Sequence, residues 1–147
     1  MSHRTFTLAV IAGIALAGCD ESVSNLVGPT QQLRPAFSSI QDQIFENADS
    51  SGRPACVQCH NAGGQFFAGG LNLEHAVAYG NLVNVASRDK TGETRVIPGN
   101  AESSYLIHKL EGRPTIAGAR MPLNGPYLTA GQIDVIKQWI DEGAAND

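Results

Sequence analysis

Three side chains that can bind a cofactor stand within five positions of one another. Cys56, Cys59 and His60 belong to the stretch CVQCH. C-x-x-C-H is the attachment signature of c-type haem. Two cysteines at this spacing lie on one side of a helical turn, where each thiol can form a thioether with one vinyl group of the porphyrin. The adjacent imidazole then offers a ring nitrogen to the iron. We therefore expect one covalently bound haem c, attached at Cys56 and Cys59, with His60 as an iron ligand.

A second axial ligand is expected from the later part of the chain. Met121 is the only methionine that remains if Met1 is removed with a signal peptide. Pro122 follows it and disfavours a helical backbone at Met121, so a loop can present the thioether sulfur to the iron. We predict Met121 as this ligand, although a methionine can also fill a gap beside a core. His75 and His108 are the competing sixth ligands; both residues can equally be surface histidines.

The N-terminus has the features of an export signal. Arg4 precedes an apolar run from Phe6 to Leu16, and small residues follow, as in a secretory signal peptide. The run is too short to span a bilayer comfortably. The stretch LAGC, which ends at Cys19, resembles the bacterial lipobox, in which the signal is cut before a cysteine that carries lipid. We predict a lipoprotein signal over 1–18, lipid attachment at Cys19, and an exported protein in the cell envelope or periplasm. An uncleaved anchor or an ordinary signal is the alternative.

Length and composition indicate one domain after this signal. The chain has 147 residues, of which 42% are hydrophobic, and this suits a single small core. Residues 19–36 lack helical periodicity and contain three helix-breaking residues, so we expect a flexible tether there and a domain over 37–147. The net charge of −4 argues against a nucleic-acid partner, which requires a basic surface. With Cys19 assigned to lipid, only Cys56 and Cys59 remain, so no disulfide framework is expected.

The periodicity of apolar residues predicts a mostly α domain of about four helices with long loops. The first helix is expected to be capped by Ser38 or Ser39, to include a Ser38–Gln41 capping box and to end near 49–55. The second is expected over 71–79 with Gly80 at its end. The third is expected to start at Asn100 and to be stopped by Gly112 and Pro114.

The last helix has the strongest signals. Thr129 and Gln132 form a capping box, and Gly143 stands where a C-terminal cap belongs. Apolar stripes are expected in the first, third and last helices: Phe37, Ile40, Ile44; Leu106, Leu110; Ile133, Ile136, Trp139, Ile140. The only strand candidate is 82–87.

Five stretches together carry a resemblance to a known family. CVQCH, GGLNL, PGNAESSYLIHKL, MPLNG and LTAGQIDVIKQWIDEGA occur in this order. From about 40 to 144 the chain resembles a single-haem, class I-like c-type cytochrome domain of the bacterial exported, planctomycete-type kind. The resemblance implies a cytochrome c-like fold, thioethers at Cys56 and Cys59, and His60 and Met121 on opposite sides of the iron. It also implies that the first and last helices pack together, with Ile44 and Trp139 as the candidates for this contact.

The expected function is therefore one-electron transfer by a membrane-tethered carrier, not catalysis. Its partner would be a redox protein: a respiratory complex, an oxidase or another cytochrome. Arg95 or Arg120 is a candidate to neutralise a haem propionate.

Three other functions are compatible with the same residues. The first is a haem enzyme, such as a peroxidase or a sulfur-compound oxidase, with a labile sixth ligand. The second is a zinc site that combines the cysteine pair with histidines. The third is a thioredoxin-like C-x-x-C, for which the βαβ context is missing.

Overall fold

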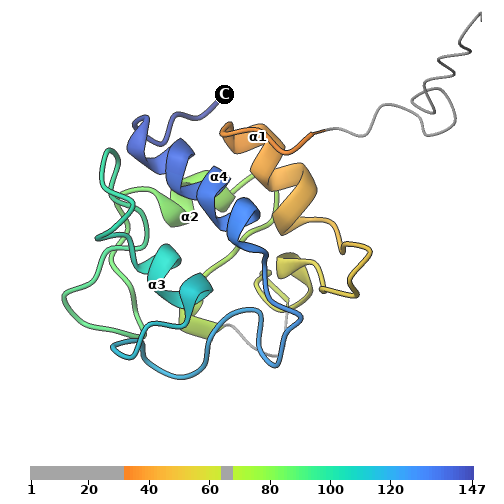
Figure 1. Ribbon diagram of the computed structural model, residues 1–147. Helices are drawn as coiled ribbons and strands as arrows, with labels where there is room; N and C mark the ends of the chain where they lie inside the picture. Colours follow the sequence, from red (N-terminus) through yellow and green to blue (C-terminus); the bar gives the residue numbers. More distant parts are fainter. Residues whose placement is uncertain (1–31, 64–67) are drawn as a thin grey trace, which may run out of the picture. The chain divides into compact units, whose positions relative to one another are not determined.

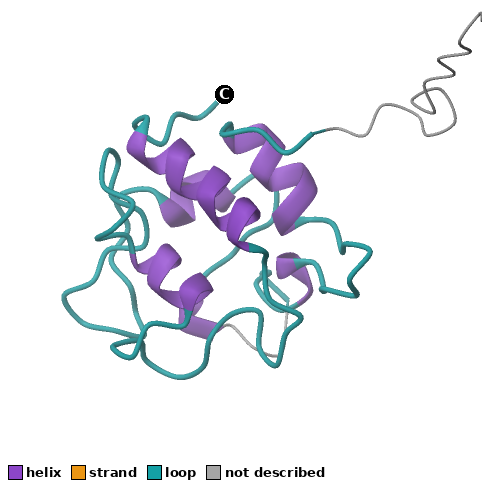
Figure 2. Cartoon of the chain, viewed as in Figure 1, coloured by secondary structure: helices purple, strands orange, loops and turns teal. Residues whose placement is uncertain are grey.

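The computed structural model describes residues 32–63 and 68–147. The predicted signal peptide, Cys19 and most of the predicted tether lie outside the described residues. The described part belongs to one compact unit, Gln32–Asp147. It is mostly helical, with long loops between short helices (Figures 1 and 2). Among the described residues, no helix is both long and apolar enough to cross a bilayer.

Four α-helices carry the core: α1 (Phe37–Ile40), α2 (Ala78–Leu82), α3 (Tyr105–Glu111) and α4 (Ala130–Asp141). A π-helical turn, η2 (Gln41–Phe45), continues α1 directly, and the short 3-10 turns η3 (Cys56–Gln58) and η4 (Ala68–Gly70) follow. The predicted fold class, mostly α with about four helices, is therefore confirmed. The strand expected over 82–87 is wrong: the described chain has only isolated bridges there, Val83 with Val96 and Ala86 with Thr94.

The first helix starts differently from the prediction. Ala36 is its N-cap and makes no side-chain capping bond, so the capping roles predicted for Ser38 and Ser39 are wrong. The amide and hydroxyl of Ser38 instead donate to the carboxylate of Asp147, at 3.1 and 3.0 Å. Gln41 does not complete a capping box, because its amide nitrogen donates to the carbonyl of Leu73. Both partners are remote in sequence, so a local pattern does not reveal them.

The second and third helices begin later than predicted. Residues 71–74 are not helical, because the Leu73 amide donates to the carbonyl of His60 at 2.9 Å. Helix α2 begins at Ala78 and includes Gly80, which therefore does not end it. The side chain of Asn100 caps a turn by accepting from the Ser103 amide, and α3 begins only at Tyr105.

The end of α3 and both ends of α4 follow the sequence prediction. Gly112 ends α3 in a left-handed conformation with φ of 74°. Thr129 and Gln132 form the predicted capping box of α4. At the other end of α4 the Gly143 amide donates to Ile140 and the Ala144 amide to Trp139, which is the Schellman arrangement.

The predicted apolar stripes of α1, η2 and α4 form the core. Within α3, Leu110 is buried and Leu106 is partly buried. The first and last helices meet through Phe37, whose ring lies 5.5 Å from that of Trp139. Ile44, the residue predicted for this contact, belongs to the same buried cluster. Leu33 from the expected tether also packs against this cluster. The core residues are Phe37, Ile40, Ile44, Phe45, Leu73, Ala78, Leu82, Val96, Ala101, Ile107, Leu110, Leu128, Ile133, Ile136, Trp139, Ile140 and Ala144.

Candidate functional site

The cysteine box folds into one tight turn. Residues 56–58 form a 3-10 turn, and the amides of Cys59 and His60 both donate to the carbonyl of Cys56, at 3.2 and 2.9 Å. The helical turn expected for the C-x-x-C spacing is therefore present. Asn61 closes the turn, because its side-chain amide donates to the carbonyl of Val57.

The two cysteines have different environments. Both thiols are free, and Cys59 is exposed, whereas Cys56 is half-buried. The Cys56 thiol donates to the carbonyl of Ile44 at 3.4 Å, and burial raises the pKa of Cys56 to about 11. The charge of Arg53 acts in the opposite direction on this pKa. At neutral pH Cys56 is therefore a protonated thiol that points toward the end of η2, while Cys59 is open to a modifying group.

The imidazole of His60 is held in an environment that favours its neutral form. Burial lowers the pKa of His60, while the Leu71 backbone and the carboxylate of Asp89 act to raise it. The positive charges of Lys109 and Arg95 lower it further. The Nδ1 atom of His60 is buried without a hydrogen-bond partner among the described residues. A neutral imidazole with an uncommitted nitrogen is the form that ligates metals.

Charged side chains act on the pKa of this imidazole. Arg95 is buried and donates to the carbonyls of Asn81 and Gly69, at 2.7 and 2.6 Å. Gly69 has a φ of 65°, and a Cβ atom there would lie 2.7 Å from a carboxylate oxygen of Asp89. Only glycine therefore fits at this position without a shift of Asp89.

Met121 is connected to the same region through Lys109. Its amide donates to the Lys109 carbonyl at 2.9 Å, and its side chain packs partly buried against the core cluster. Cys56 and Leu71 pack against this cluster as well. The ammonium of Lys109 donates to the carbonyls of Ala117 and Ala119, so Lys109 fastens the loop that carries Met121 to α3. As predicted, Met121 lies in a loop.

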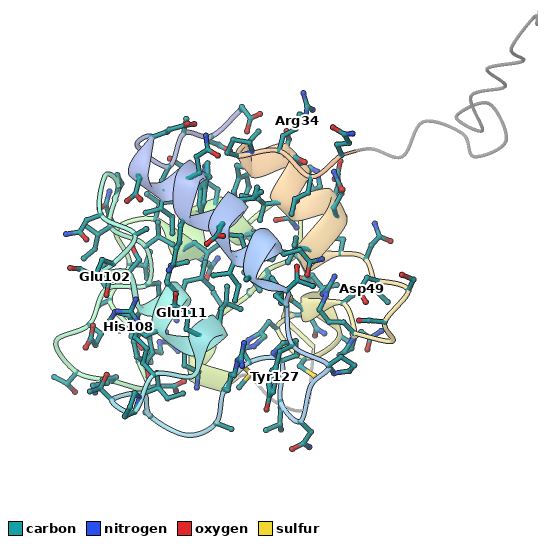
Figure 3. All side chains as sticks on the ribbon, in the orientation of Figure 1. Arg34, Asp49, Glu102, His108, Glu111 and Tyr127 are labelled. Atoms are coloured by element: carbon teal, nitrogen blue, oxygen red, sulfur yellow. The ribbon has the colours of Figure 1, made fainter. Side chains whose placement is uncertain are left out.

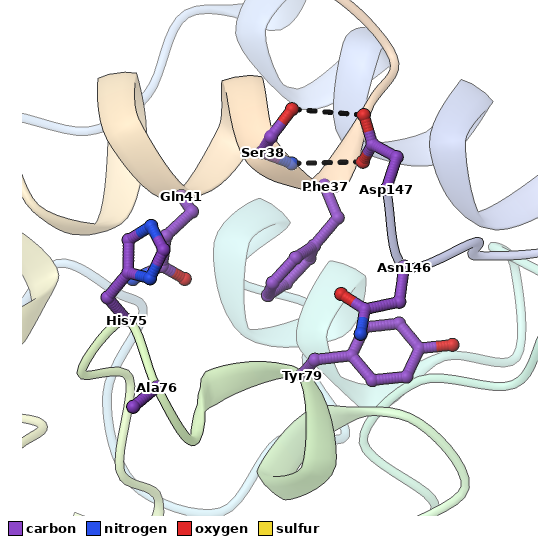
Figure 4. Close-up of a pocket in the computed structure, with 8 residues that line it drawn as sticks. All are labelled: Phe37, Ser38, Gln41, His75, Ala76, Tyr79, Asn146 and Asp147. Atoms are coloured by element: carbon purple, nitrogen blue, oxygen red, sulfur yellow. Dashed lines mark hydrogen bonds between the residues drawn. The ribbon is translucent and has the colours of Figure 1, made fainter.

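His75 and His108, the competing candidates for the sixth ligand, lie in environments that differ from that of His60. His75 is exposed and lines a small cavity of about 130 Å³ with residues of α1, α2 and the C-terminal segment (Figure 4). The Nε2 atom of His108 lies 2.8 Å from the carbonyl of Glu102, and Nδ1 lies 3.9 Å from the carboxylate of Glu93. Figure 3 shows His108 beside Glu102. Neither histidine is among the groups that shift the pKa of His60.

The two candidate arginines also differ. The charge of Arg95 acts on the pKa of His60, whereas Arg120 donates to the Leu110 carbonyl and covers the ring of Tyr127 at 4.0 Å. Tyr127 is labelled in Figure 3. Of the two, only Arg95 is among the groups that act on the pKa of His60.

The described residues do not support the zinc and thioredoxin-like readings. Nowhere in residues 32–63 and 68–147 do three His, Cys, Asp or Glu side chains converge as a metal site would require. The same residues contain no strand, so the βαβ context of a thioredoxin-like motif is missing there.

Several residues around the box were not predicted. Arg53, Asp89, Lys109 and the Leu71 backbone all act on Cys56 or His60. Arg53 stands three positions before Cys56, and this proximity is the one local signal of its role. Asp89 and Lys109 come from distant segments, and no local pattern connects them to the box. Comparison with protein-family models, curated proteins and solved structures finds no match to this chain.

Proposed function

We propose that this protein carries one covalent haem c and transfers single electrons. The observation that supports it best is the pairing of two free thiols with a partly buried imidazole in one turn. The donor set fits the group: Cys56 and Cys59 supply the thioether sulfurs, and His60 supplies a neutral nitrogen. In this proposal the helices form a cytochrome c-type fold around the haem. When bound, the haem supplies a reversible one-electron couple at its iron.

The chain's own residues have distinct tasks in this proposal. His60 and Met121 would both ligate the haem iron, which would leave a substrate no free coordination site. The carbonyl of Lys109 holds the Met121 amide at 2.9 Å and so sets the position of this loop. Arg95, which is buried and whose charge acts on the pKa of His60, would neutralise a propionate. Methionine as the second ligand would raise the reduction potential relative to two histidines.

The expected location and partner complete the proposal. The protein is exported, carries lipid on Cys19 and remains attached to a membrane. Its partner is a redox protein, either a respiratory complex, an oxidase or another cytochrome. The acidic net charge is compatible with docking to a basic surface.

Covalent haem is the decisive test. The full chain should be matured in a host that attaches haem c, and then analysed by a pyridine haemochrome spectrum and by intact mass. We expect one haem per chain and no thiol at Cys56 or Cys59 that reacts with iodoacetamide. His60→Ala should abolish the normal spectrum, whereas the matched variant His75→Ala should leave it unchanged. A colourless protein with both thiols reactive would overturn the proposal.

A further inference from the structure

Arg53 is a fully buried charge directly before the cysteine box. All five N–H groups of its guanidinium have acceptors within 3.4 Å. These acceptors are one carboxylate oxygen of Asp49 and the carbonyl oxygens of Gln43, Ile44, Asn47 and Pro54. Because every N–H group has an acceptor, these hydrogen bonds offset the desolvation cost of burying the guanidinium charge.

The acceptors come from the two segments that frame the box. Gln43 and Ile44 belong to η2, whereas Pro54 belongs to the stretch that leads into Cys56. Asp49 and Gly52 form the turn between these segments, and the Arg53 amide also donates to the carboxylate of Asp49. Arg53 therefore fastens the loop before the box to the end of the first helical segment.

One acceptor is shared with Cys56. The carbonyl of Ile44 accepts from Nη1 of Arg53 at 3.0 Å and from the Cys56 thiol at 3.4 Å. Cys59 makes no such contact and is exposed. The Arg53 network therefore reaches one thiol of the pair and not the other.

We propose that Arg53 is the positioning residue for Cys56, so that covalent attachment at Cys56 depends on Arg53 while attachment at Cys59 does not. This inference rests on the proposed function for the identity of the attached group. In thioether formation the S–H bond of the cysteine is replaced by an S–C bond to one vinyl carbon. The hydrogen goes to the neighbouring vinyl carbon, so the addition itself consumes no oxidant or reductant.

The first measurement uses the matured full chain. Peptide mass spectrometry should determine the fraction of chains with a thioether at each cysteine in wild type, Arg53→Met, Arg53→Lys and Arg113→Met. Arg113 is the matched control, because its ion pairs are with Glu102 and Glu111 and not with a residue of the box. We expect Arg53→Met to lose most attachment at Cys56 and to keep attachment at Cys59. The fraction of chains attached at Cys56 should be intermediate in Arg53→Lys, between those of Arg53→Met and wild type. In Arg113→Met it should equal the wild-type fraction. Equal loss at both cysteines would indicate a merely structural role and would overturn the inference.

The second measurement does not need haem. In the full chain produced without attached haem, iodoacetamide should modify Cys56 at least about tenfold more slowly than Cys59, because Cys56 is partly sheltered. Arg53→Met should remove this difference, and Arg113→Met should keep it. A wild type that never acquires haem would refute the proposed function, but this comparison would still decide the role of Arg53. Equal rates in wild type, or an unchanged ratio in Arg53→Met, would overturn the inference.

Discussion

The ring of Phe37 lies 5.5 Å from the ring of Trp139, with 37° between the ring planes. Phe37 also meets Tyr79 edge to face at 5.2 Å. This aromatic group joins the first, second and last α-helices, which are far apart in the sequence. The contact between the first and last helices is therefore aromatic, and it is centred on Phe37.

Phe37→Ala should destabilise the domain strongly. Removal of a buried phenylalanine leaves a cavity and typically costs about 3–5 kcal/mol. We expect a loss of this size in the free energy of unfolding, measured by chemical denaturation of the matured protein. Leu123→Ala is the control, because Leu123 is 58% exposed and its loss should change stability little. Equal effects of the two variants would contradict the central position of Phe37.

Asp49 should make the free energy of unfolding depend on pH. Hydrogen bonds from Ser51, followed by those from Arg53, hold the pKa of Asp49 well below its ordinary value of 3.8. The ionised carboxylate therefore stabilises the fold above pH 3.8, and this contribution is lost as the pH falls through the lowered pKa. At pH 7 Asp49→Asn should cost about 1 kcal/mol, because Asp49 is partly exposed to solvent.

Urea denaturation at several pH values would check this dependence. The difference between wild type and Asp49→Asn should shrink as the pH falls below 3.8. Asp134→Asn, at an exposed position of α4, should show no comparable change. A constant difference between wild type and Asp49→Asn across this range would argue against the expected role of Asp49.

In the proposed haem protein, Met121→Ala should keep the haem and leave its iron without the second protein ligand. The thioethers at Cys56 and Cys59 would be unaffected, so the haem should remain attached. Loss of the methionine sulfur should lower the reduction potential, remove the weak absorption at the red end of the oxidised spectrum, and allow carbon monoxide to bind rapidly. Leu123→Ala, in the same loop, should change none of these. Rapid binding of carbon monoxide to the untreated wild-type protein would instead favour a haem enzyme with a labile sixth ligand.

Cys19→Ala should release the protein from membranes. In the proposed lipoprotein the wild-type chain fractionates with membranes and loses residues 1–18, and its intact mass includes lipid. The variant should lack the lipid and appear in the soluble fraction, with an unchanged haem spectrum. An unmodified N-terminus in a soluble wild-type protein would contradict lipid attachment at Cys19.

Local signals in the sequence predicted some elements well. The capping box of Thr129 and Gln132, the end of α3 at Gly112 and the apolar stripe of α4 depend on neighbouring residues, and all three are confirmed. The turn of the cysteine box is likewise set by a spacing of a few residues. These features could be predicted because the partners lie within one or two helical turns.

Remote partners explain the errors. Ser38 was expected to cap its own helix, but its amide bonds to Asp147, 109 positions away (Figure 4). Residues 71–74 were expected to be helical, but the amide of Leu73 bonds to His60. The same limit applies to the site, because Lys109 and Asp89 reach His60 only through the tertiary fold. Arg53 was missed because its full burial depends on five acceptors whose arrangement emerges only in the folded chain.

The contact of Phe37 with Trp139 has a consequence for the order of biogenesis. A ribosome or an export channel releases the chain from its N-terminal end, so Phe37 emerges long before Trp139 is available. The hydrophobic core cannot close until α4 has been delivered. In the proposed haem protein, late synthesis of α4 would therefore leave a period in which haem could be attached at Cys56 and Cys59 before the domain becomes compact.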